Sequence, residues 1–205
     1  MFDKGNFSRA LQAIEVSVRD NIFDRLEAAY TQPHRYYHNQ SHISECLRLF
    51  ANHRHQANYP GEVEIALWFH DAIYDPRRSD NEERSAVWIS DYLQTNGANT
   101  EAIARITDLI LATKTHTHLN SIDRQLTIDI DLAILGYSRE AFEAYDRAIR
   151  QEYAWVREPQ YKQARSSVLQ GFLQRPRIYS TEAFLDLYEH QARSNLRAKI
   201  AELNA

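Results

Sequence analysis

The sequence predicts an all-α fold, and two observations support this class. Apolar residues recur every three or four positions along most of the 205 residues, which is the period of a helix with one buried face. Glycine and proline are scarce, with five of each, whereas sandwiches, barrels and Rossmann folds need many turns. Because 43% of the residues are hydrophobic, the chain can bury a large core. We expect one compact domain over residues 1–205 with eight or nine helices.

The first part of the chain predicts three helices. The first covers residues 7–29 and ends before Gln32-Pro33, because the residue before a proline avoids the helical conformation. The second covers residues 39–53. The third covers residues 63–74 and is apolar nearly all round, which is typical of a helix at the centre of a domain.

The remaining helices follow from similar signals. Asn96-Gly97 closes a fourth helix, since glycine suits the left-handed position after a helix. Residues 113–126 are polar and are expected to form a loop. Ser138 is a good N-cap for the helix that follows it. The helices expected here cover residues 81–94, 100–112, 128–135, 138–156, 158–174 and 181–203.

Composition excludes several classes of protein. The net charge is −4 with no basic tract, so we expect no nucleic acid polymer as partner. The single cysteine, Cys46, allows no disulfide within the chain, which is typical of a reducing compartment. No stretch approaches the roughly 20 apolar residues of a spanning helix. We therefore expect a cytoplasmic protein without membrane contact; a homodimer remains open.

The adjacent pair His70-Asp71 is the most informative feature of the chain. It lies at the polar end of the apolar third helix, where burying an unpaired carboxylate is costly. A divalent cation removes this cost, because it pairs with the carboxylate and accepts the imidazole nitrogen. Further donors lie upstream and downstream of the pair. They are His38, His42, Asp129 and Asp131.

The spacing of these residues bears on a shared site. His38 and His42 are four apart, which on a helix places both side chains on one face. His70 and Asp71 diverge by about 100° on a helix, yet they can share a cation at a seam between two helices. A mixed nitrogen and oxygen set suits Mn²⁺, Fe²⁺, Zn²⁺ or Mg²⁺. We expect Cys46, one turn after His42, to be a small buried hydrophobe.

The ordered pattern H…HD…D resembles the HD superfamily of metal-dependent phosphohydrolases. The stretches YYHNQSH, ALWFHDAIYDPRRSDNEERSA and DIDLAILG are similar to a bacterial subfamily of predicted metal-dependent HD phosphohydrolases. RQEYAWV, Arg165 with the SSVLQGFL that follows, and ARSNL resemble it too, so the likeness covers about residues 33–196. It implies a single HD-type helical domain.

The resemblance also implies roles for residues. The metal ligands would be His42, His70, Asp71 and Asp131. Asp131 is preferred over Asp129 because a leucine follows it, as in the cyclic-nucleotide phosphodiesterases of the superfamily. Those enzymes carry a similar Y-H-N-x-x-H stretch whose first histidine donates a proton to the leaving oxygen. Carried to this chain, His38 is the candidate general acid.

Asp75 is a second catalytic candidate by resemblance. It falls where alarmone hydrolases of the superfamily have an acidic residue in their H-D-x-x-E-D motif. Tyr74 replaces the glutamate of that motif, and Leu135 replaces an asparagine after the last ligand. These departures argue against an alarmone as the substrate.

The expected function is hydrolysis of a phosphate mono- or diester of a small molecule, a nucleotide among the candidates. Arg35, Lys114 and Arg124 flank the motifs and are candidates for holding phosphates. The alternative is a non-catalytic HD-fold module that binds a nucleotide or a partner. A di-iron oxygenase would need more ligands, which His116 and His118 could supply; His116 could equally bind a phosphate.

One acidic residue outside the motif has two readings. Glu82 lies at the start of the fourth predicted helix. There it could stabilise the helix N-terminus, where negative charge is favourable. Alternatively, it could reach the water of the active site.

Overall fold

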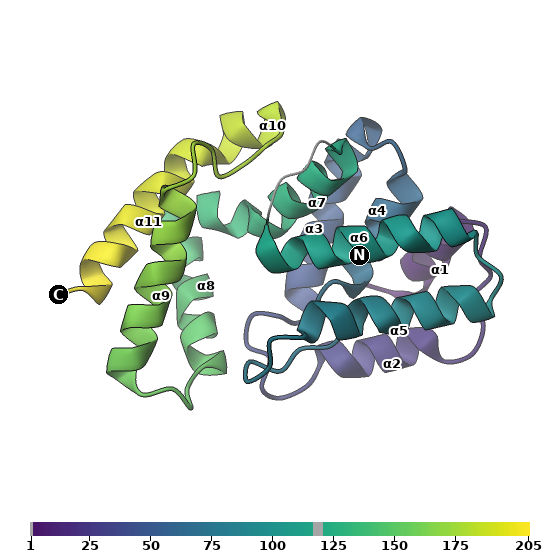
Figure 1. The fold of residues 1–205 in the computed structure, drawn as a ribbon, viewed down its shortest axis with the longest axis horizontal. Helices are drawn as coiled ribbons and strands as arrows, with labels where there is room; N and C mark the ends of the chain where they lie inside the picture. The colour runs from purple at the N-terminus through teal and green to yellow at the C-terminus, as the bar shows by residue number, and fades with distance from the viewer. Residues whose placement is uncertain (1, 117–120) are drawn as a thin grey trace. The chain divides into compact units, whose positions relative to one another are not determined.

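The structure is a computed structural model that describes residues 2–116 and 121–205 (Figure 1). These residues contain helices and no β-strand, so the all-α class is confirmed. The chain divides into two compact units, Met1–Ile130 and Asp131–Ala205, which we describe separately. The division falls inside one helix, α7 (Ile122–Leu132). The single domain expected from the sequence stays a prediction.

The helices of each unit follow one another with short connections. The first unit contains α1 (Lys4–Gln12), α2 (Ile22–Tyr30), α3 (Gln40–His53), the 3₁₀ turn η1 (Arg54–Gln56), α4 (Pro60–Phe69), α5 (Asn81–Thr95), α6 (Thr100–Thr115) and most of α7. The second contains the end of α7, η2 (Ala133–Gly136), α8 (Arg139–Glu152), α9 (Glu158–Leu173), the three-residue α10 (Glu182–Phe184), η3 (Leu185–Glu189) and α11 (His190–Leu203).

Helix α4 is the centre of the first unit. It packs against α1, α3, α5 and α6. Trp68 and Phe69 are fully buried, and the Trp68 ring contacts the ring of Phe7 at a centroid distance of 5.3 Å. The Tyr30 hydroxyl donates a hydrogen bond to the carbonyl of Trp68 at 2.9 Å. The prediction that the most apolar helix is central is confirmed. The hydrogen bond from Tyr30 fixes the C-terminal end of α4.

Helix α4 ends at Phe69, five residues before the predicted end at residue 74. Side chains from elsewhere take the backbone groups that would continue the helix. The Arg35 guanidinium donates to the carbonyls of Asp71 and Ala72, at 2.6 and 2.9 Å. The N–H of Ile73 donates to Ser85 Oγ at 2.9 Å. His70 and Asp71 therefore lie in a turn rather than on a helix.

Helix α7 begins at Ile122, about six residues before the predicted start. Two polar residues of this helix, Asp123 and Thr127, are buried. The Asp123 carboxylate accepts the backbone N–H groups of Asn58 and Tyr59, at 2.6 and 2.9 Å. The Thr127 hydroxyl donates to the Asp123 carbonyl at 2.7 Å. Polar side chains that form hydrogen bonds to the backbone inside the fold interrupt the apolar period. The sequence therefore does not predict the first turns of this helix.

The predicted helix over residues 7–29 is two helices, α1 and α2. Glu15 and Asp20 lie between them in the left-handed region, with φ of 61° and 59°. Neither is a glycine, and no proline marks the break. The apolar period continues through the connection, since Val16 is buried there, so the periodicity runs across both helices.

The second unit is organised around α11, which packs against α9, α8, η2 and η3. Arg165 and Asp146 form a buried ion pair at 2.9 Å, and Lys199 joins it at 3.3 Å from Asp146. Asn195 Nδ2 donates to the carbonyls of Leu135 and Tyr137, both at 2.9 Å. Arg165, in one of the stretches that carry the resemblance, thus joins α9 to α8.

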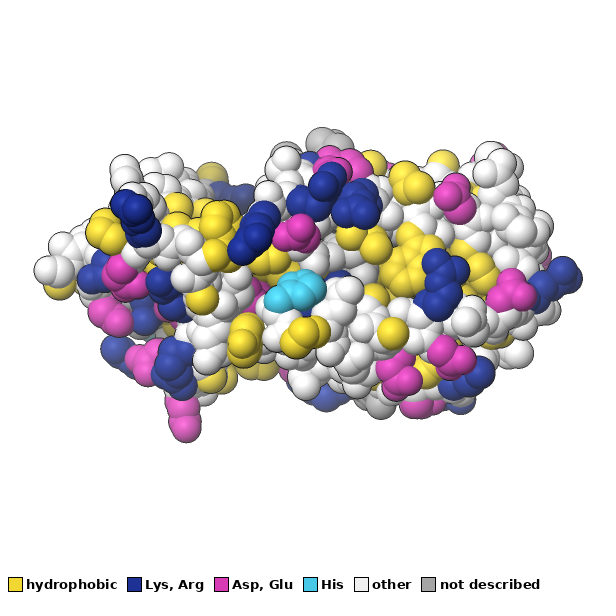
Figure 2. Space-filling view, turned by 90° about the horizontal axis from the view of Figure 1, so that it is seen from below, with side chains coloured by type: hydrophobic (Ala, Val, Ile, Leu, Met, Phe, Trp, Pro, Cys, Tyr) yellow, Lys and Arg dark blue, Asp and Glu magenta, His cyan; other side chains and the backbone are white. Residues whose placement is uncertain are grey.

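The surface agrees with the mixed charge of the sequence. On the face that Figure 2 shows, acidic and basic side chains are interspersed among hydrophobic ones. Within the described ranges, no helix combines the length and apolar character that crossing a bilayer requires.

Candidate metal centre

Two imidazoles and a carboxylate meet beyond the end of α4. His42 Nε2 lies 3.2 Å from His70 Nε2, and His70 Nε2 lies 3.1 Å from Asp71 Oδ2. The distance from His42 Nε2 to Asp71 Oδ2 is 3.6 Å. Both histidines are buried, at 7% and 1% exposure, and the Asp71 side chain is 14% exposed. Three of the four predicted ligands therefore form one small triangle.

The local backbone explains how α3 contributes to this triangle. Asn39 Oδ1 caps α3 by accepting the N–H of Ser41 at 2.9 Å. Asparagine is among the preferred N-cap residues. The cap places His42 in the first turn of α3, on the face that packs toward α4.

The protonation of His70 follows from its second nitrogen. His70 Nδ1 lies 3.1 Å from the carbonyl of Leu67, and a carbonyl can only accept, so Nδ1 carries the hydrogen. In the neutral ring, the lone pair of Nε2 then points at His42 and Asp71. Three electron-rich atoms at these distances repel one another unless a proton or a metal ion lies between them. The hydrogen bond from His70 Nδ1 to the Leu67 carbonyl is the kind of contact that usually orients a metal-binding histidine.

The spacing of the triangle fits a metal ion. With bonds of about 2.1 Å, neighbouring ligand atoms are roughly 3.0 Å apart around an octahedral ion and roughly 3.4 Å apart around a tetrahedral one. The three observed separations, 3.1 to 3.6 Å, lie close to this range. The donor set thus suits a divalent cation in both type and spacing.

A second group of donors contains both histidines of the triangle, with Cys46 and Asp131 in place of Asp71. The sequence assigned Cys46 to packing. One ligand atom each of His42, Cys46, His70 and Asp131 lies within 4.8 Å of all the others, so this group could hold a metal ion. Asp131, the next-to-last residue of α7, is in the group, and its role as a metal ligand stays a prediction. Cys46 Sγ is 3.8 Å from His42 Nε2. Its spacing of four from His42 on α3 was the signal available in the sequence.

The electrostatics of Asp71 favour the ionised form. In the metal-free site, burial raises the pKa of this carboxyl group, but the positive charges that His70, His38 and His42 carry when protonated, and a hydrogen bond from the protonated His70 ring, lower it by more. The net pKa of Asp71 lies well below its usual range. A carboxylate that is already ionised can bind a cation without first losing a proton.

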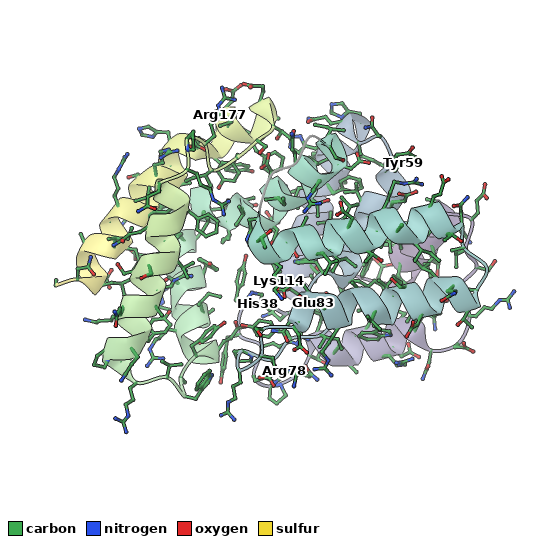
Figure 3. All side chains as sticks on the ribbon, viewed as in Figure 1. His38, Tyr59, Arg78, Glu83, Lys114 and Arg177 are labelled. Carbon is green, nitrogen blue, oxygen red and sulfur yellow. The ribbon has the colours of Figure 1, made fainter. Side chains whose placement is uncertain are left out.

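His38 lies beside the triangle but precedes α3, so the helical spacing that paired it with His42 does not apply. Its half-buried ring stacks on the ring of Tyr74, with centroids 4.2 Å apart and planes at 26°. Figure 3 labels His38. The ring centroid is 6.1 Å from that of His42. His38 is therefore near the ligands without belonging to the group of four.

Arg35 and Asp75 bind backbone. Arg35 is 6% exposed and donates to the carbonyl of His38 at 3.0 Å, in addition to those of Asp71 and Ala72. It thus joins the His38 segment to the end of α4. The Asp75 carboxylate accepts the N–H of Arg77 at 2.9 Å, within a turn. The substrate and catalytic roles expected for these two residues stay predictions.

The other candidates lie at the end of α6. The Lys114 ammonium pairs with the Glu83 carboxylate and donates to the Ser79 carbonyl, and Figure 3 labels both Lys114 and Glu83. His116 is the left-handed C-cap of α6, with φ of 49°, and its N–H donates to Ala112 at 2.9 Å. His118 lies outside the described residues. Binding of a phosphate by Lys114 or His116 stays a prediction.

Comparison with known proteins adds no assignment. No protein-family model matches the chain, and neither a curated protein nor a solved structure matches it.

Proposed function

We propose that this protein is a metal-dependent phosphohydrolase of the HD type, acting in the cytoplasm on a phosphate mono- or diester of a small molecule. The observation that carries the proposal is the triangle of His42 Nε2, His70 Nε2 and Asp71 Oδ2, with no side longer than 3.6 Å. These three residues and Asp131 would hold the ion. The resemblance of the flanking motifs to HD phosphohydrolases supports the same reading.

Each residue has a distinct task in the proposed reaction. A bound divalent cation polarises a phosphoryl oxygen and makes water a stronger acid. The Leu67 carbonyl orients the His70 ring so that the lone pair of Nε2 points toward the proposed metal site. Asp71 supplies negative charge there. His38 protonates the leaving oxygen as the phosphorus–oxygen bond breaks, and acid catalysis of this kind contributes about 10²–10⁴-fold.

The donor set narrows the choice of metal. Two imidazoles and two carboxylates suit Mn²⁺, Fe²⁺ or Zn²⁺, and Mg²⁺ prefers oxygen alone. The Cys46 thiol near His42 adds a soft donor, which favours zinc or iron. We therefore expect higher affinity for Zn²⁺ or Fe²⁺ than for Mg²⁺.

The test combines metal analysis with a substrate screen. Metal per chain is measured on freshly purified protein, and hydrolysis of p-nitrophenyl phosphate, bis-p-nitrophenyl phosphate and nucleotides is followed with each metal. His70→Ala is expected to lose both metal and activity. The control His55→Ala changes an exposed histidine after α3 and is expected to keep both.

Two outcomes would contradict the proposal. Full metal content in His70→Ala would refute the ligand assignment. Metal-loaded wild-type protein that releases nothing from any ester, yet is stabilised by a nucleotide, would instead identify a binding module.

A further inference from the structure

The first turn of α5 carries two acidic side chains in different surroundings. Glu83 pairs with Lys114, and this hydrogen bond lowers the pKa of Glu83. Glu82, its neighbour, is half-buried. Among the described residues, its carboxylate has no hydrogen-bond or ion-pair partner beyond its own backbone. A half-buried carboxylate without a partner is costly, so its presence calls for an explanation.

Glu82 belongs to the buried face of α5. The buried residues of this helix are Asn81, Ser85, Ala86, Ile89 and Leu93. At 100° per residue, Glu82 points within about 20° of Ile89, which is fully buried. The carboxylate is therefore directed along the inner side of the helix.

The residues on either side of Glu82 fasten this turn to the segment after Asp71. Asn81 Oδ1 accepts the N–H of Asp75 at 3.1 Å, and Asn81 Nδ2 donates to the Asp75 carbonyl at 3.0 Å. Ser85 Oγ accepts the N–H of Ile73 at 2.9 Å. The anchored segment begins two residues after Asp71, so the turn that carries Glu82 is fixed next to the candidate metal centre.

The charge of the centre acts on Glu82. Burial raises the pKa of this carboxyl group, and the negative charge of Asp71 raises it further, while Lys114 opposes both. A half-buried acid that feels the charge of Asp71, and whose carboxylate has no partner among the described residues beyond its own backbone, resembles a general base more than a structural group.

We propose that Glu82 is the general base of the reaction, accepting a proton from the water that attacks phosphorus. The inference rests on the proposed function. As the oxygen of water bonds to phosphorus, its proton passes to the Glu82 carboxylate. The bond from phosphorus to the leaving oxygen breaks, and His38 gives that oxygen its proton. The two proton transfers balance, and no further reactant is needed.

The test compares Glu82→Gln with Glu101→Gln, which changes an exposed acid in the first turn of α6. In Glu82→Gln, kcat should fall at least about 10²-fold with little change in KM, because a general base contributes about 10²–10⁴-fold. Metal affinity, measured by competition with a chelator, should weaken by at most about tenfold, the lower end of the roughly 10–100-fold loss typical when a hydrogen-bond partner of a metal ligand is removed. Glu101→Gln should leave kcat and metal affinity unchanged.

The Tm of the metal-free protein distinguishes catalysis from a helix-terminus role. If Glu82 serves the site, Gln removes a half-buried charge that has no ion-pair partner among the described residues, and the Tm of the metal-free variant should rise. If Glu82 stabilises the N-terminus of α5, Gln should lower the Tm, and that result overturns the inference. An unchanged kcat in an active preparation overturns the inference alone. Wild-type protein that hydrolyses no ester overturns the proposed function and this inference together.

Discussion

Replacing Arg35 with alanine separates a structural role from substrate binding. The sequence places Arg35 among the phosphate-binding candidates, yet its guanidinium is buried and donates to three main-chain carbonyls, those of His38, Asp71 and Ala72. It also donates to Gln32 Oε1 at 3.1 Å. We expect Arg35→Ala to unfold more easily because the two segments that carry the site lose their connection.

The size of the effect follows from these contacts. A hydrogen bond to a charged group contributes about 1.5–3 kcal/mol, which for three bonds gives about 4.5–9 kcal/mol. Two reductions apply, since water can reach the freed carbonyls near the partly exposed Asp71, and the buried guanidinium no longer has to be desolvated. A net loss of about 3 kcal/mol remains, and for a chain of this size it lowers the Tm by roughly 6–12 °C.

The assay is calorimetry together with steady-state kinetics. Arg78→Ala is the control, because Arg78 makes two hydrogen bonds of 2.7 Å to Asp80 but is 47% exposed. Exposed ion pairs contribute little, so the Tm of the control should barely change. If Arg35→Ala keeps the Tm of the wild type while KM rises tenfold, Arg35 binds substrate and the structural reasoning is wrong.

Two further predictions concern the second unit. In Gly136→Ala, the new Cβ would meet the backbone of Tyr188, with its carbonyl oxygen at 2.7 Å, so we expect a loss of about 1–3 kcal/mol in urea unfolding; an unchanged midpoint would show that η3 moves aside freely. The Tyr161 hydroxyl is buried without a partner among the described residues, so Tyr161→Phe should gain about 1 kcal/mol at pH 7. Burial raises the pKa of Tyr161 from 10.0 to about 12 in the folded protein. Between these two pH values the hydroxyl is ionised in the unfolded chain but not in the folded protein, so the stability of the wild type falls as the pH rises. The phenylalanine variant should lose less stability over that window, and an equal loss would contradict the assignment.

The sequence predicts the fold well where burial follows the helical period. The apolar run before His70 identified the central helix, and Trp68 and Phe69 are fully buried there. The sequence predicts the fold less well where buried polar side chains interrupt that period. Asp123 holds the backbone before α4 from inside the fold, and the polarity of its segment gave no sign of the first turns of helix α7.

The sequence predicted which residues lie at the site better than it predicted how the backbone places them. His42, His70 and Asp71 meet as expected, because each lies next to an element whose identity the sequence reveals. The turn at His70 depends on Arg35, which is thirty-five residues away, and local patterns cannot show such a contact. Cys46 was assigned to packing because a lone buried cysteine has the same signature in either role.

Anomalous diffraction from crystals of the zinc- or manganese-loaded protein tests the central claim most directly. We predict one strong peak within bonding distance of Nε2 of His42, Nε2 of His70 and Oδ2 of Asp71. A peak bound elsewhere, or histidines that bind through Nδ1 instead, would contradict the account.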